Sequence, residues 1–230
     1  MQGGVDGVEA VVFDVLGTLV DEPGGIRSAI GEAVPGAGDD RVSQLVALWQ
    51  RHVENQQHRI VVGERAYAGS TVLDREAAGR VAGDAGLADA AVVDRLALAG
   101  RRLRPWADSA TALARIGSAL PTVGLSNADR STLLWLSARA GLRWHQVLSA
   151  DDVGTYKPAA QVYRAALDVV GCEPERVLMV AAHAWDLRAA RATGMRTAYV
   201  ARPVGDPPVD SDVVDGRFTC LDDLAAALDR

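Results

Sequence analysis

The chain has 230 residues, of which 49% are hydrophobic, and it carries a formal net charge of −6 at pH 7. This size allows a core domain with a smaller insertion, while the lack of a long apolar run argues against a membrane protein and the negative charge argues against a nucleic-acid partner. Two isolated cysteines and a first stretch without a secretory pattern lead us to expect a reduced, cytoplasmic protein.

Short apolar runs alternate with helical patterns along most of the chain. The runs 9–14, 122–126, 176–181 and 196–201 predict strands, and a further strand ends at 147–150. Helices are expected at 109–118, 130–140, 159–170, 186–193 and 221–228, and a surface loop at 202–215. The glycines Gly141, Gly171 and Gly194 mark expected helix ends. This alternation predicts an α/β fold with a doubly wound, Rossmann-like parallel sheet.

Between residues 21 and 105 the strand signals disappear. Apolar residues recur at helical spacing in 44–53, 71–86 and 90–103. Because this insertion follows the first strand and precedes the second, we expect a helical cap over the carboxyl ends of the strands, where α/β proteins bind ligands. The predicted organisation is a core of residues 1–20 and 106–230 with a cap of residues 21–105.

Four short motifs stand at the ends of predicted strands. They are FDVLGTLV with Asp14 and Thr18, LSNAD with Ser126 and Asn127, YKP with Tyr156 and Lys157, and AAHAWD with His183, Trp185 and Asp186. Together they would bring a carboxylate nucleophile, hydroxyl and amide donors, a cation and a second carboxylate into one crevice. Such a set suits an anionic electrophile.

With Asp14, Ser126, Lys157 and Asp186 in this order, the chain resembles the haloacid dehalogenase superfamily over nearly its whole length. Phosphatases of that superfamily carry a second Asp two residues after the nucleophile, as general acid, and a later Gly-Asp pair that supplies a magnesium ligand. Here Leu16 replaces the second Asp, and two alanines at 181 and 182 replace the Gly-Asp pair. Both changes disfavour phosphoryl transfer. The chain is more similar to the L-2-haloacid dehalogenase branch, which needs no metal.

The resemblance implies hydrolysis of short 2-halocarboxylates, such as haloacetates and 2-halopropionates, without metal or cofactor. Asp14 would displace halide from the carbon next to the carboxylate, and water would then cleave the resulting ester. Lys157 would keep Asp14 ionised, since a nearby opposite charge favours the carboxylate form. Thr18 and Ser126 would orient oxygens, and Asp186 would orient or deprotonate the water.

The resemblance also suggests residues for the substrate pocket. Asn127 would touch the departing halide, and Tyr156 would support the site beside Lys157. We expect Leu16 and Trp185 to lie at the pocket as well. A core tryptophan is the ordinary alternative for Trp185.

Two features leave the details open. The branch uses a cap arginine to bind the substrate carboxylate and halide; Arg41, eight residues before Trp49, is the candidate, and Arg51 is the reserve. His183 stands where well-known dehalogenases have an asparagine. It could bind substrate or water or act as an acid–base group, and a purely structural histidine is an equal alternative.

Two other functions stay in view. A phosphatase with degenerate motifs would show strict magnesium dependence on a phosphoester, and Leu16 argues against it. A non-catalytic relative would keep the fold for binding or assembly, but retention of Asp14, Lys157 and Asp186 argues against that function. The oligomeric state is open, and a homodimer is possible because relatives are often dimers.

Overall fold

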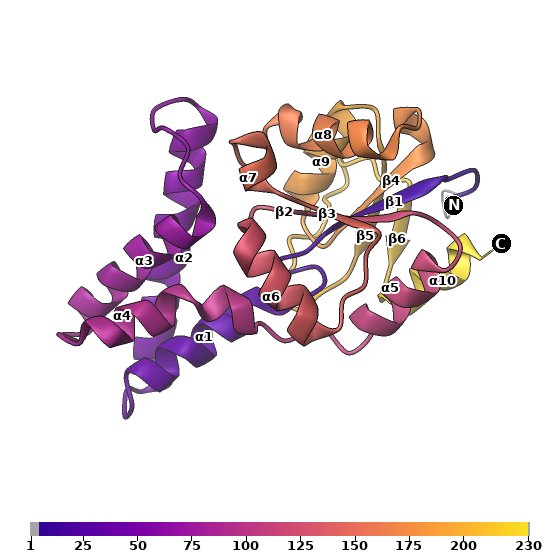
Figure 1. Cartoon of the computed structure of the whole chain (residues 1–230). Helices are drawn as coiled ribbons and strands as arrows, with labels where there is room; N and C mark the ends of the chain where they lie inside the picture. Colours follow the sequence, from indigo (N-terminus) through magenta and orange to yellow (C-terminus); the bar gives the residue numbers. More distant parts are fainter. Residues whose placement is uncertain (1–4, 230) are drawn as a thin grey trace.

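The computed structural model describes residues 5–229, and their centre is a six-stranded parallel sheet (Figure 1). The strands are β1 (Ala10–Asp14), β2 (Thr122–Ser126), β3 (Gln146–Ser149), β4 (Val177–Ala181), β5 (Arg196–Val200) and β6 (Gly216–Phe218). They lie in the order β3-β2-β1-β4-β5-β6, so β1 pairs with β2 on one side and β4 on the other. The direction of winding therefore reverses at β1, where ligands bind in open α/β sheets. The predicted α/β fold is confirmed.

Helices cover both faces of this sheet (Figure 1). The helices that follow the cap are α5 (Ser109–Gly117), α6 (Arg130–Ala140), α7 (Ala150–Val153), α8 (Ala160–Val170), α9 (Ala184–Ala192) and α10 (Leu221–Leu228), with a short 3₁₀ turn η2 (Pro174–Arg176). Alternate residues of β1 point to opposite faces: Val11 and Phe13 pack with α5, α6 and α10, while Val12 packs with α8 and α9. Burial on both faces explains why β1 is an unbroken apolar run before Asp14.

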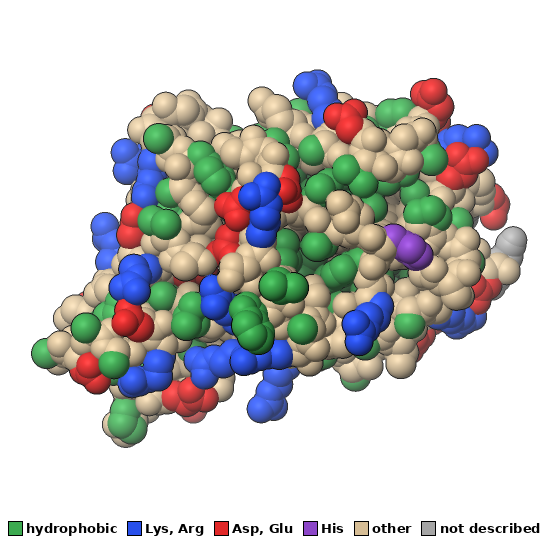
Figure 2. Space-filling model, in the orientation of Figure 1, with side chains coloured by type: hydrophobic (Ala, Val, Ile, Leu, Met, Phe, Trp, Pro, Cys, Tyr) green, Lys and Arg blue, Asp and Glu red, His purple; other side chains and the backbone are tan. Residues whose placement is uncertain are grey.

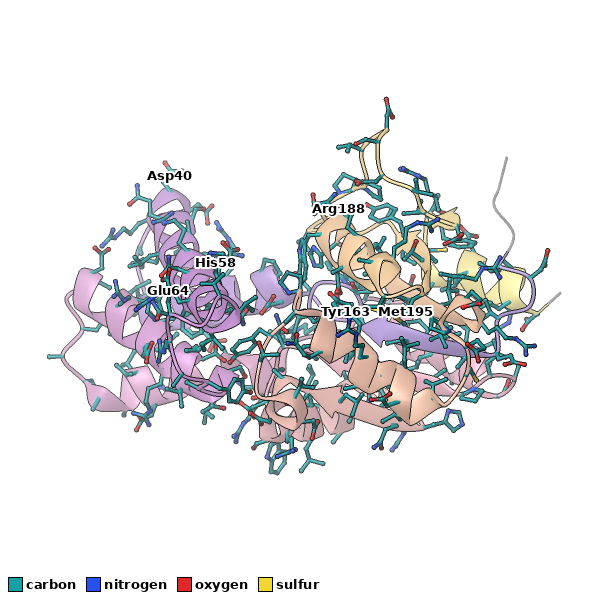
Figure 3. The ribbon with its side chains drawn as sticks, turned by 90° about the horizontal axis from the view of Figure 1, so that it is seen from above. Asp40, His58, Glu64, Tyr163, Arg188 and Met195 are labelled. Atoms are coloured by element: carbon teal, nitrogen blue, oxygen red, sulfur yellow. The ribbon has the colours of Figure 1, made fainter. Side chains whose placement is uncertain are left out.

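The segment between β1 and α5 forms a helical layer beside the sheet (Figure 1). Its helices are α1 (Glu22–Ala33), α2 (Asp39–Val61), α3 (Ser70–Asp84), α4 (Ala90–Ala97) and the 3₁₀ helix η1 (Ala99–Arg102). They share a hydrophobic core of their own, which includes Ile30, Leu45, Trp49 and Leu96. Figure 3 shows Asp40, His58 and Glu64 in this half of the molecule, away from the sheet.

Several elements differ from the expectation. Helix α2 spans 23 residues, well beyond the predicted 44–53, because polar residues continue it on its exposed side. Helix α1 was not predicted, since three glycines interrupt its apolar pattern. It begins where the Asp21 side chain accepts a hydrogen bond from Gly24 N at 2.9 Å. Strand β6 was also missed, because it has only three residues.

The expected loop 202–215 is partly ordered by backbone pairing. Asp206 N donates to Ala182 O, and Ala184 N donates to Asp206 O, both at 2.8 Å. The loop thus supports the turn after β4. None of the helices within residues 5–229 has both the length and the apolar character needed to cross a bilayer. Figure 2 shows acidic and basic side chains interspersed over one face of the surface.

Asp129 joins the helical layer to the core. Its side chain accepts hydrogen bonds from Ser70 Oγ and Thr71 N at the start of α3, both at 3.0 Å, and from Thr132 N in α6 at 2.8 Å. Burial acts to raise the pKa of Asp129, but the hydrogen bonds from Thr71, Thr132 and Ser70 outweigh it and hold the pKa below its ordinary value. The carboxylate therefore caps one helix while it fastens another.

We expect Asp129→Asn to lower the free energy of unfolding by about 1–3 kcal/mol, because an amide NH₂ cannot accept the bonds that one carboxylate oxygen accepts. The folded-state pKa is depressed, so the stabilisation is present above the unfolded value and is lost as pH falls through the folded value. Urea unfolding at neutral and acidic pH measures both effects. Asp39→Asn, at an exposed position, is the control, and equal losses in the two variants at neutral pH would contradict the role of Asp129.

Candidate active site

A cleft of about 390 Å³ lies between the carboxyl end of the sheet and the helical layer. The core side is lined by Asp14, Leu16, Asn127, Lys157, His183 and Trp185. The helical side is lined by Glu22, Ile26, Trp49, Gln50, Val53, Glu54 and Gln57. The position is the one that the reversal of winding at β1 favours.

Lys157 joins two carboxylates at the base of the cleft. Its Nζ donates to Asp14 Oδ1 and to Asp186 Oδ2, both at 2.6 Å, and all three residues are buried. Burial alone would lower the pKa of Lys157, but the charges of Asp14 and Asp186 and their hydrogen bonds outweigh it and raise the pKa above its ordinary value. Lys157 is therefore a permanent cation beside Asp14.

Thr18 holds the second oxygen of Asp14. Thr18 Oγ1 donates to Asp14 Oδ2 at 2.5 Å and accepts from Ala182 N at 2.9 Å. The turn that carries Thr18 needs a glycine at position 17. Gly17 has a φ of +81°, and the Cβ of any other residue there would lie only 2.4 Å from His183 Nε2. Both oxygens of Asp14 are thus fixed, and each keeps a lone pair for reaction.

Asp186 lies deeper than Asp14. It is the third residue of α9, after His183 at the N-cap position. Tyr163 OH donates to Asp186 Oδ1, and Tyr163 lies fully buried on α8 in the core half of the molecule (Figure 3). Burial raises the pKa of Asp186, with Lys157 and Tyr163 acting against it. Asp186 does not line the cleft, so its action on a water molecule stays a prediction.

Ser126 and Asn127, which follow each other at the end of β2, have different roles. Ser126 Oγ is buried and accepts from Ala128 N at 3.1 Å, so it shapes the turn after β2 rather than lining the cleft. Asn127 Oδ1 accepts from Lys157 N at 2.8 Å, and its Nδ2 donates to Gln57 Oε1 at 3.2 Å. Asn127 therefore orients the lysine segment and contacts the helical layer while it lines the cleft.

His183 and Trp185 form an aromatic wall. Their rings stack with centroids 5.9 Å apart, and Lys157 Nζ lies 5.8 Å from the centroid of the Trp185 ring. Leu16 lines the cleft near them. The structure thus places His183, Trp185 and Leu16 at the cleft, as the sequence predicted for Trp185 and Leu16.

The prediction that Arg41 binds the substrate does not fit this structure. Arg41 lies in the first turn of α2, where its guanidinium pairs with Asp84 at 2.8 Å on the surface. The part of α2 that faces the cleft begins with Trp49, about 12 Å further along the helix axis. The reserve candidate Arg51 is exposed and does not line the cleft either. The spacing of eight residues between Arg41 and Trp49 led to the wrong residue, because a spacing does not tell which turn of the helix reaches the site.

Tyr156 supports the site from outside the cleft. It is fully buried, and its OH donates to Ala68 O at 2.6 Å in the connection between α2 and α3. Its ring packs on Tyr67, with centroids 5.5 Å apart. Tyr156 supports the segment before Lys157, as expected, but it does not line the cleft, so its place among the substrate-pocket residues is corrected to a structural one.

Several cleft residues were not predicted. Gln50, Glu54 and Gln57 stand at helical spacing on α2, so the phase of that helix, counted from Trp49, would have found them. Tyr163 follows Lys157 by six residues on the buried face of α8, a position that looks like ordinary core. Glu22 had no sequence signal, because it belongs to the unpredicted helix α1.

The donor set does not fit a magnesium ion. Lys157 Nζ already pairs with one oxygen of Asp14 and one of Asp186, both at 2.6 Å. Residues 181 and 182 are alanines, and Leu16 brings an apolar side chain. Within residues 5–229, no group of three or more His, Cys, Asp or Glu side chains is arranged to hold a metal. Octahedral oxygen coordination therefore has too few ligands here.

Comparison with known proteins agrees with this geometry. A family model described as haloacid dehalogenase-like hydrolase matches residues 8–194. The (S)-2-haloacid dehalogenase of Xanthobacter autotrophicus is 33% identical over 199 residues, which cover 85% of this chain and 76% of that protein. A crystal structure of a defluorinating L-2-haloacid dehalogenase superposes with a TM-score of 0.86 at 33% identity, covering 97% of this chain and 96% of the other.

A second structural relative bears on the chemistry. It is the L-2-haloacid dehalogenase from Xanthobacter autotrophicus with chloropropionic acid covalently bound. It has a TM-score of 0.82 at 27% identity, and the match covers 96% of this chain and 98% of that chain.

We expect Lys157→Met to lower the free energy of unfolding by about 3–5 kcal/mol, because it leaves two carboxylates in a buried site without their cation. The loss should persist through about pH 10, since the folded-state pKa of Lys157 is raised and its contribution disappears only as pH rises further. Denaturant unfolding of the variant measures it.

A matched double variant separates charge from packing. In Asp14→Asn/Lys157→Met one of the two negative charges is gone, so part of the lost stability should return. Full wild-type stability of Lys157→Met alone would show that the ion pair does not carry the site.

Proposed function

The chain belongs to the haloacid dehalogenase-like hydrolase family, and we propose from this premise that it hydrolyses the carbon–halogen bond of short 2-haloacids. The observation that carries the proposal is the cleft-lining carboxylate of Asp14, held by Thr18 and by the buried ammonium of Lys157. Such a carboxylate stays anionic and correctly aimed, as a nucleophile requires. The relatives named as haloacid dehalogenases, and the one with chloropropionic acid covalently bound, support the same chemistry.

The first step is displacement at carbon. A carboxylate oxygen of Asp14 attacks the carbon that bears the halogen; a C–O bond forms, the C–halogen bond breaks, and the halide leaves with the bonding electrons. Halide leaves without a proton, so no general acid is needed at position 16. The leucine there supplies an apolar wall instead.

The second step is hydrolysis of the ester. Water attacks the carbonyl carbon of the Asp14 ester, and the bond between that carbon and the ester oxygen breaks, while the bond from the ester oxygen to the substrate carbon stays intact. The Asp14 carboxylate is regenerated, a 2-hydroxy acid leaves, and one proton is released. Lys157 Nζ and Thr18 Oγ1 already contact the two oxygens of Asp14. They can therefore stabilise the negative charge that develops on the carbonyl oxygen. His183, which lines the cleft, and Asp186 behind Lys157 are the candidates that accept the proton of the water.

The helical layer of residues 21–105 acts, in this proposal, as a cap that closes the site and selects the substrate. It contributes seven of the residues that line the cleft, from Glu22 and Ile26 on α1 to Gln57 on α2. A cleft of about 390 Å³ is large enough for a haloacetate or a 2-halopropionate with water. Exclusion of bulk water on binding would strengthen the electrostatic contacts of Asp14.

We expect halide release from chloroacetate, fluoroacetate and one enantiomer of 2-chloropropionate in the presence of a chelator. Asp14→Asn should lower the rate by about a thousandfold or more, because it removes the nucleophile. The measurements are free halide and the mass of the protein during turnover, which should show an added acid on Asp14. Asp39→Asn, at an exposed cap position, is the control. Cleavage of a phosphoester only when magnesium is added, with no halide release, would replace the proposal by a phosphatase.

Arg41→Ala should leave kcat/KM for halide release within about twofold of the wild type. The side chain pairs with Asp84 at an exposed position outside the cleft, and such surface pairs contribute little. Steady-state kinetics with chloroacetate measure the effect. A large rise in KM would show that α2 rearranges to bring Arg41 to the substrate.

A further inference from the structure

The cap side of the cleft carries negative charge. Glu22 lines it from α1 and Glu54 from α2, and Lys157 is the one Lys or Arg among the lining residues of the described chain. The ammonium of Lys157 already donates to both Asp14 and Asp186. A carboxylate substrate entering this cleft would therefore meet more negative than positive charge, and like charges at close range repel.

Glu22 is the more buried of the two cap acids. Its carboxyl is half-buried, and no hydrogen bond or ion pair to that carboxyl is present within residues 5–229. Burial raises its pKa to about 7; repulsion from Asp14 and Glu54 adds to the rise, and Lys157 acts in the opposite direction. Glu22 thus lines the same cleft as Asp14 and carries a carboxyl whose pKa is raised toward neutral pH.

The groups around Glu22 come from several elements. Asp14 from β1, Glu54 from α2, Lys157 before α8 and His183 before α9 line the same cleft. Asp74 on α3 is a further acidic neighbour; burial and then the charge of Glu22 raise its pKa.

Cations also pack near α1, but on another side. Arg102 and Arg104 line a separate hollow with Asp21 and Glu32. They do not line the cleft that holds Glu22, so they do not replace a cap cation there.

We propose that Glu22 is a specificity-determining residue whose neutral carboxyl donates a hydrogen bond to the substrate carboxylate in this cleft. This inference rests on the proposed dehalogenation of 2-haloacids. A neutral acid removes one negative charge from the cleft and supplies a donor, whereas its ionised form repels the substrate and only accepts. Substrate binding and a proton on Glu22 are then linked, so the cleft takes up the substrate best when that proton is present.

The pH dependence of kcat/KM for halide release from 2-chloropropionate, measured between about pH 5 and 9, tests this linkage. The substrate carboxylate stays ionised above about pH 5, so its own titration does not shape the profile. In the wild type we expect kcat/KM to fall about tenfold per pH unit above an inflection near pH 7. Glu22→Gln keeps a neutral donor, so it should hold the low-pH value up to pH 9. Glu22→Leu is neutral without a donor; its profile should be flat, with KM about tenfold higher than in Glu22→Gln.

Two further variants assign the inflection to Glu22. Glu54→Gln removes a charge that raises the pKa of Glu22, so the inflection should remain and move to lower pH. His183→Asn should keep the inflection. A protonated histidine would also favour an anionic substrate at low pH, so loss of the inflection in His183→Asn but not in Glu22→Gln would overturn the proposal. An unchanged profile in Glu22→Gln would overturn it equally.

The design separates this inference from the proposed function. Absence of halide release by the wild type at every pH would contradict dehalogenation itself. Halide release with a profile that ignores Glu22 would leave dehalogenation in place and remove only the role of Glu22. Melting temperatures of all variants show whether a lost activity comes from a lost fold.

Discussion

The site depends on one ammonium group, that of Lys157, buried between the carboxylates of Asp14 and Asp186. Two carboxylates at such close range in a buried site could not both stay ionised without a cation, because desolvation and mutual repulsion favour a proton on one of them. The lysine fixes the charge state and also the geometry, since its two partners, Asp14 and Asp186, come from elements far apart in the sequence. The parallel sheet makes this possible: β1 lies at its centre, and the turns after β1 and β4 end at the same edge. The Thr18 hydroxyl, which bridges Asp14 and the backbone after β4, completes the frame.

The core and the cap have opposite electrostatic roles. The core contributes the cation and the nucleophile, while the cap contributes amides, apolar side chains and two acids to the same cleft. The described residues of the cap supply no Lys or Arg to the cleft, so a cap cation cannot recognise the substrate anion there. Recognition can rest on the state of a proton, because a neutral carboxyl is a donor and an ionised one is not. The cost of moving between these forms is small near neutral pH for a group whose pKa is about 7, as for Glu22.

The sequence predicted the core well and the cap poorly, for a physical reason. Strands buried on both faces read as continuous apolar runs, so β1 and β2 were placed to within a residue, together with the acid that ends β1. The same edge of the sheet collects Asp14, Lys157 and Asp186 whatever the details of the loops. Cap helices lack such a rule: which turn of α2 meets the cleft depends on how it packs on α1 and α3, and Arg41 was misplaced for that reason. The contact of Tyr156 with Ala68 joins distant segments and leaves no local pattern.

The connection between α2 and α3 is fastened to the core although no chain crossing occurs there. Tyr67 OH donates to Asp151, Tyr156 OH donates to Ala68 O, and Asp129 holds the first turn of α3. The cap is thus attached at three places: the two chain crossings near residues 21 and 105 and this polar clasp. The cap of this protein therefore cannot be exchanged as an independent unit. A related core that received it would need carboxylates and a tyrosine at the positions of Asp129, Asp151 and Tyr156.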